Sequence, residues 1–90
     1  MHYEKDKVVQ GIYKTIDIDL VAALSLYHPI KKAERSRASN QRVIFSFEAT
    51  DELMADVKSY RDREMAVEPQ AYYFQLRNIR SQINDLKEIN

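Results

Sequence analysis

The spacing of apolar residues predicts a buried helix in the first third of the chain. Within residues 13–27, the segment from Ile18 to Tyr27 is apolar on almost every side, which is typical of a helix buried on more than one face. Thr15 or Asp17 is the expected N-cap, and Pro29 ends the helix because the residue before a proline is pushed out of helical geometry. We therefore expect this helix at the centre of the core.

The next segment, residues 30–48, has the pattern of a β-hairpin. Val43, Phe45 and Phe47 alternate with mostly polar neighbours, as in a strand with one buried face. The charged stretch 30–35 is the expected partner strand, and charges of this kind protect an edge strand from pairing with other molecules. The polar connection between the strands has no glycine and is longer than a two-residue turn.

A second helix is expected directly after the hairpin. Thr50 is followed by Asp51 and Glu52, the order of an N-cap and the acidic first turn that the helix dipole favours. Apolar residues then recur at helical spacing on one face. The pattern predicts that this helix ends near Glu64 or Met65.

The last helix is expected from about Gln70 to near the end of the chain. Pro69 fits its first position, where the missing N–H costs nothing. Its apolar residues are spaced four, three, four and three, which is a heptad pattern of little more than two repeats. We call these residues the heptad seam: Tyr72, Leu76, Ile79, Ile83 and Leu86.

These elements predict the α+β class, in a small single domain with the order helix, β-hairpin, helix, helix. Ninety residues suffice for one domain on a single core. Residues 13–90 are expected to form the compact part. Gly11 marks a break, and residues 1–12 are expected to form either an N-terminal arm or an extra strand.

Composition excludes several classes of protein. With no cysteine, neither a disulfide framework nor a thiolate metal site can form. The longest nearly apolar run, from Leu20 to Tyr27, is less than half of the roughly 20 residues that cross a bilayer. The start, MHYEKDK, lacks the apolar region of a signal peptide. We expect a cytoplasmic protein that does not contact membranes.

The formal net charge is zero, but the charges are unevenly distributed. Residues 1–30 sum to −1, 31–42 to +4, 43–69 to −4 and 70–90 to +1. A basic hairpin beside an acidic helix makes a dipolar surface. The candidate binding residues are the hairpin cations and two arginines of the last helix: Lys31, Lys32, Arg35, Arg37, Arg42, Arg77 and Arg80.

The sequence offers little for catalysis or metal binding. One glycine cannot build a phosphate-binding loop, and there are only two histidines. His28 is expected to be a helix-terminus residue, favoured there by the dipole. Asp17 and Asp19 are two apart at a helix start, so capping is expected in place of metal binding. We expect no enzyme, no cofactor and no metal ion.

Two hypotheses for function remain open. The first is a non-catalytic binding module that contacts a nucleic-acid backbone or an acidic protein through the basic hairpin. The absence of aromatic residues at the hairpin tip argues against base stacking there. The second is a structural or interaction protein that forms a homodimer, or docks a partner protein, through the heptad seam. The partner and the oligomeric state cannot be derived from the sequence.

Residues spread over most of the chain after the first dozen carry a resemblance to a known family: Tyr13, Lys14, Thr15, Asp17, Leu20, Ala22, Ala23, Glu34, Arg35, Val43, Phe45, Phe47, Glu48, Leu53, Val57, Tyr60, Val67, Pro69, Tyr73, Leu76 and Arg77. On these residues the chain resembles a family of uncharacterised prokaryotic proteins, the domain of unknown function numbered 5659. The family usually has a glycine after its first helix, where this chain has Tyr27, His28 and Pro29, so that turn departs from the family pattern. The resemblance supports the fold prediction and implies no known activity.

Overall fold

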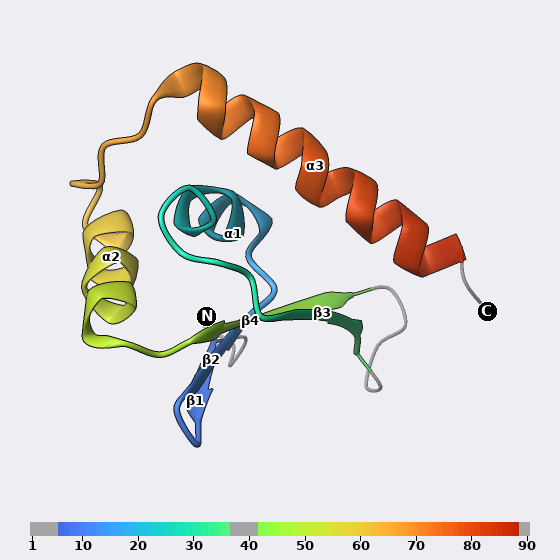
Figure 1. The fold of residues 1–90 in the computed structure, drawn as a ribbon, viewed down its shortest axis with the longest axis horizontal. Coiled ribbons are helices and arrows are strands. Elements are labelled where there is room, and N and C mark those ends of the chain that lie inside the picture. The colour runs from blue at the N-terminus through green and yellow to red at the C-terminus, as the bar shows by residue number, and fades with distance from the viewer. Residues whose placement is uncertain (1–5, 37–41, 89–90) are drawn as a thin grey trace, which may run out of the picture.

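A computed structural model describes residues 6–36 and 42–88, which form a four-stranded antiparallel sheet with three helices (Figure 1). The sheet order is β1-β2-β4-β3. The predicted α+β class is therefore confirmed. The elements are β1 (Lys7–Val9), β2 (Ile12–Thr15), α1 (Ile18–Leu24), β3 (Lys32–Arg35), β4 (Val43–Glu48), α2 (Asp51–Arg61) and α3 (Pro69–Glu88).

The chain begins with a hairpin, so the predicted helix-first order is wrong. β1 and β2 are joined by Gln10 and Gly11, whose φ angles are 53° and 78°. Positive φ at both central residues matches a turn to the right-handed twist of two strands. Residues 1–12 are expected to form an arm or an extra strand, and their described part contains the strand β1. Residues 1–5 lie outside the described part of the chain.

β2 is one of the two central strands of the sheet, and its residues alternate between buried and partly exposed positions. Tyr13 and Thr15 are 3% and 0% exposed and lie opposite Phe47 and Phe45 of β4. Alternate residues of a strand point to opposite faces, so Lys14 faces the other side of the sheet. Thr15 is thus part of a buried strand and does not cap the following helix.

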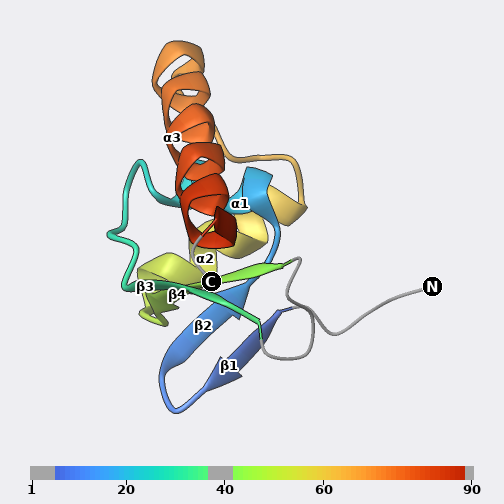
Figure 2. The same ribbon diagram turned by 90° about the vertical axis from the view of Figure 1, so that its right-hand side faces the viewer.

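α1 is the centre of the core, as predicted. Asp17 is its N-cap and accepts a hydrogen bond from the Leu20 amide at 3.3 Å. The helix ends at Leu24, three residues before the predicted Tyr27. Residues 20–24 are all buried, because α1 packs among the sheet, α2 and α3 (Figures 1 and 2).

The second hairpin is confirmed. β3 pairs antiparallel with β4, with Ala33 opposite Phe45 and Arg35 opposite Val43. On β4, the buried side chains of Val43, Phe45 and Phe47 join α1 in one apolar cluster. The centre of the predicted loop, residues 37–41, lies outside the described residues.

α2 starts where the sequence predicts and ends early. The Thr50 side chain accepts from the Leu53 amide at 3.0 Å. The helix ends at Arg61 in place of the predicted Glu64 or Met65, with Arg63 in the left-handed region at φ 62°. The Glu64 amide donates to the Ser59 carbonyl at 2.8 Å, which completes a Schellman C-cap.

α3 begins at Pro69 as predicted, and Glu68 caps it by accepting from the Ala71 amide at 2.7 Å. It crosses over α1 on the side away from the sheet (Figure 1). Ile79 is 1% exposed. The other residues of the heptad seam pack against the same core: Tyr72, Leu76, Ile83 and Leu86. No helix among the described residues is long and apolar enough to span a membrane.

Candidate binding surface

The sheet has one face covered by helices and one face that no described element covers (Figures 1 and 2). We call the second the outer face. Its residues follow from the strand registers, because directly opposite residues of neighbouring strands share a face. The outer face contains Lys7, Val9, Ile12, Lys14, Lys32, Glu34, Ile44, Ser46 and Glu48.

A row of three lysines and one serine crosses the outer face. Lys7 lies opposite Lys14, Lys14 opposite Ser46, and Ser46 opposite Lys32. Neighbouring strands are about 4.8 Å apart, so Lys14 and Lys32 leave the sheet roughly 10 Å apart with Ser46 between them. We call these four residues the lysine–serine row. It places positive charge from β1, β2 and β3 on one line.

A pocket of about 460 Å³ lies over the middle of this row. Ser46 lies in its lining but is only 3% exposed, and its Oγ has no hydrogen-bond partner in the structure. A buried hydroxyl without a partner costs about 1–3 kcal/mol, so such groups are rare and require an explanation. The pocket is lined by Ile12, Lys14, Lys31, Lys32, Glu34 and Ser46.

One carboxylate, that of Glu34, reduces the positive charge of the pocket. The Lys32 Nζ lies 3.3 Å from a Glu34 carboxylate oxygen, and the two side chains are 64% and 37% exposed. Exposed ion pairs contribute only about 0–1 kcal/mol, so this pair holds Lys32 weakly. Three lysines face one glutamate in the pocket lining.

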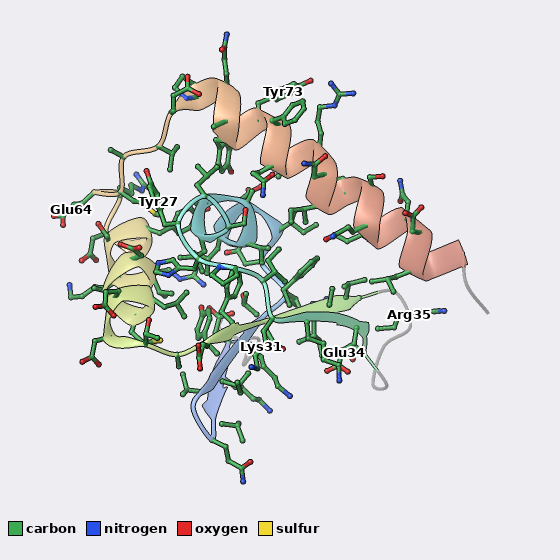
Figure 3. The ribbon with its side chains drawn as sticks, viewed as in Figure 1. Tyr27, Lys31, Glu34, Arg35, Glu64 and Tyr73 are labelled. Carbon is green, nitrogen blue, oxygen red and sulfur yellow. The ribbon has the colours of Figure 1, made fainter. Side chains whose placement is uncertain are left out.

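The structure divides the predicted basic cluster of the hairpin. Lys31 and Lys32 line the outer-face pocket, whereas Arg35 lies opposite Val43 and so belongs to the helix-covered face. In Figure 3, Glu34 and Arg35 leave β3 in different directions. Arg42 is exposed just before β4, and Arg37 lies outside the described residues.

The two candidate arginines of α3 are on the helix side of the molecule. The Arg77 guanidinium carbon lies 5.8 Å from the centre of the Tyr73 ring. Figure 3 shows Tyr73 pointing away from the core. Arg77 and Arg80 are exposed, but α3 does not bring them next to the outer face. They do not extend the lysine–serine row.

Three of the four residues of the row, Lys7, Lys14 and Ser46, are not among the candidates that the sequence predicts. The signal for β2 was present in the alternation of Ile12, Tyr13, Lys14 and Thr15, but it is only four residues long. The pairing of β2 with β4 joins segments about 30 residues apart, and local pattern does not reveal such a contact. Only the pairing of β2 with β4 places Lys14 opposite Ser46, so the sequence alone does not connect the two residues.

A second polar cluster joins the N-terminal hairpin to α2. Asp6 accepts hydrogen bonds of 2.7 Å from the hydroxyls of Tyr13 and Thr15 and forms an ion pair with Arg61. Arg61 also donates to Asp17 at 3.0 Å. We call these five residues the Arg61 cluster. Its carboxylates are paired, which indicates a structural role.

The pKa values in this cluster follow from its contacts. Burial opposes the charge of Asp6, but hydrogen bonds from Tyr13, Thr15 and Arg61 outweigh it and lower the Asp6 pKa. Burial and the hydrogen bond to Asp6 raise the pKa of Tyr13 well above its usual value. Outside the cluster, burial and the nearby Asp19 raise the pKa of Tyr72.

His28 and the candidate aspartates have structural partners. The His28 Nε2 lies 2.7 Å from an Asp56 carboxylate oxygen, which links the end of α1 to α2. Asp17 caps α1 and binds Arg61, as the capping prediction requires. No group of three or more metal-ligating side chains occurs among residues 6–36 and 42–88.

A family model described as "Domain of unknown function (DUF5659)" matches residues 10–85. The chain belongs to the DUF5659 family. The resemblance is therefore confirmed over β2, β3, β4, α1 and α2, and over α3 as far as residue 85. No curated protein and no solved structure matches the chain. Membership of DUF5659 assigns no activity to the outer face.

Proposed function

We propose that this DUF5659 protein is a non-catalytic binding module whose basic β-hairpin contacts the phosphate backbone of a nucleic acid. The contact is made by the outer face, with Lys31 and Lys32 from the hairpin and Lys14 from β2. The observation that carries the proposal is the lysine–serine row on the uncovered side of the sheet. Phosphate contacts fix a protein on a nucleic acid without reading its sequence.

The chemistry of the outer face favours backbone contact over base recognition. Its apolar members are the aliphatic residues Val9, Ile12 and Ile44, and its described residues include no aromatic ring on which a base would stack. A nucleic acid offers phosphates at regular intervals, which suits a line of lysines better than a single ion pair does. Neutral net charge keeps the expected affinity modest, because the remaining surface does not add to the attraction.

The experiment is a salt titration of wild-type protein with a fluorescently labelled single-stranded oligonucleotide, followed by anisotropy. Binding by three or four lysines predicts a slope of log affinity against log salt of about −2 to −3. Polyglutamate of the same length serves as the matched anion for an acidic protein partner. The proposal expects the oligonucleotide to bind more tightly than polyglutamate at every salt concentration.

Two results contradict the proposal. Absence of oligonucleotide binding at the lowest salt concentration would remove it. Tighter binding of polyglutamate than of the oligonucleotide would assign the outer face to an acidic protein instead.

A further inference from the structure

We infer that Ser46, Lys14 and Lys32 form a binding site for one phosphate group on the outer face. This inference deepens the proposed function, on which it rests, by assigning the atoms that hold a phosphate. Ser46 is on β4, the strand between β2 and β3, so it is flanked by Lys14 on one side and Lys32 on the other. The three residues belong to one row of the sheet.

The Ser46 hydroxyl points to a ligand because its hydrogen bond is not satisfied within the protein. Ser46 lines the pocket of about 460 Å³, and its Oγ is buried and has no hydrogen-bond partner in the structure. A hydroxyl both donates and accepts, so this fact alone does not choose the ligand. The two flanking lysines do, because ammonium groups only donate and carry positive charge. A group that accepts from all three is an oxyanion.

A tetrahedral phosphate fits these donors better than a planar carboxylate does. The lysines approach from opposite sides of Ser46, on strands separated by about 10 Å. A phosphate presents oxygens in several directions, so one oxygen accepts from the Ser46 hydroxyl while others face Lys14 and Lys32. A lysine ammonium acts as a point charge on phosphate and needs no planar geometry.

Glu34 sets the strength of the site. Its carboxylate is 3.3 Å from the Lys32 Nζ and lies in the lining of the same pocket. An incoming phosphate competes with this carboxylate for Lys32 and is repelled by it. Removing the charge of Glu34 should therefore tighten phosphate binding, whereas a site that does not involve Lys32 would not respond.

The test is an amide NMR titration of the full chain with inorganic phosphate at constant ionic strength, and separately with a short oligothymidylate. The variants are Ser46→Ala, Glu34→Gln and Lys14→Gln/Lys32→Gln. Ser81→Ala, which makes the same change at an exposed position of α3, is the matched control. Ser46→Ala removes a buried hydroxyl without a partner, so it is expected to fold at least as well as the wild type.

The inference predicts that phosphate shifts the amide signals around residues 14, 32 and 46. Affinity should fall about tenfold in Ser46→Ala, because a hydrogen bond to a charged group is lost. It should rise about two- to threefold in Glu34→Gln and stay unchanged in Ser81→Ala. Unchanged affinity in Ser46→Ala, or shifts confined to other elements, would overturn the inference.

The two ligands separate this inference from the proposed function. Oligothymidylate binding that depends on Lys14 and Lys32 but not on Ser46 would leave the proposed function standing and reject the phosphate site. Phosphate binding that depends on Ser46, without oligothymidylate binding, would support the site for a free oxyanion and reject the proposed function.

Discussion

Lys14 and Lys32 lie on the two strands that flank Ser46 and belong to the same row of the sheet. They are 18 positions apart in the chain, and only the insertion of β4 between β2 and β3 makes them neighbours across one residue. The relationship is therefore a product of topology. It brings two lysines of a chain without net charge to either side of one serine.

The Arg61 cluster predicts acid sensitivity that depends on Asp6. Because the folded-state pKa of Asp6 is lowered, its ionised form stabilises the protein above the usual carboxyl pKa of about 4, and this contribution is lost as the pH falls further. Asp6→Asn should lower the free energy of unfolding by about 1 kcal/mol at pH 7 and by less at pH 3. Urea unfolding at the two pH values measures this.

Asp85→Asn is the control for that prediction, because Asp85 is exposed on α3. It should leave both the stability at pH 7 and its pH dependence as in the wild type. If Asp6→Asn and Asp85→Asn lose equal stability between pH 7 and pH 3, the ion pair between Asp6 and Arg61 does not stabilise the fold.

The C-cap of α2 predicts a stabilising substitution. Arg63 has φ 62°, a left-handed conformation that costs a residue with a Cβ about 1–2 kcal/mol. Arg63→Gly should raise the free energy of unfolding by about 0.5–1 kcal/mol after the greater entropy of the unfolded glycine is subtracted. Arg63→Ala keeps the Cβ and should gain nothing. Equal melting temperatures for the two variants would contradict the prediction.

The two sides of α3 should respond differently to truncation. Ile79 is 1% exposed within the core cluster, so Ile79→Ala should cost about 2–5 kcal/mol. Phe74 is 63% exposed, so Phe74→Ala should cost less than about 0.5 kcal/mol. Thermal unfolding of the two variants measures this difference, since about 1 kcal/mol shifts the melting temperature of a domain this size by roughly 4–8 °C. A small effect at Ile79 would contradict the packing described.

The same packing bears on self-association, which stays a prediction from the heptad pattern. Because the heptad seam packs inside the monomer, we expect light scattering to give the mass of one chain at all concentrations. A mass that rises with concentration in the wild type, and not in Phe74→Lys, would show that α3 associates through its exposed side instead.

The sequence revealed the parts of the fold that local chemistry determines. Thr50 and Pro69 mark helix starts without help from the rest of the chain, and the alternation around Phe45 marks β4. The sequence does not predict the hairpin of β1 and β2, because its strands have only three and four residues. Its turn, Gln10-Gly11, is also a weaker hairpin signal than asparagine or aspartate before glycine.

The candidate surface was predictable only in part, for a related reason. Lys31 and Lys32 were found by their charge, but charge along the chain does not tell which face of a strand a residue occupies. Charge alone places Arg35 in the same group, although its register with Val43 puts it on the helix-covered face. Ser46 carries no charge, and its importance depends on the two strands that flank it.

The most direct measurement compares oligonucleotide binding by two charge-reversed variants with equal net charge. Lys14→Glu/Lys32→Glu changes the outer face, and Arg77→Glu/Arg80→Glu changes α3 on the helix side. If the outer face binds the phosphate backbone, the first variant loses binding at low salt and the second retains it, with the salt dependence of the wild type. Equal losses in both variants, or a greater loss in the α3 variant, would contradict this.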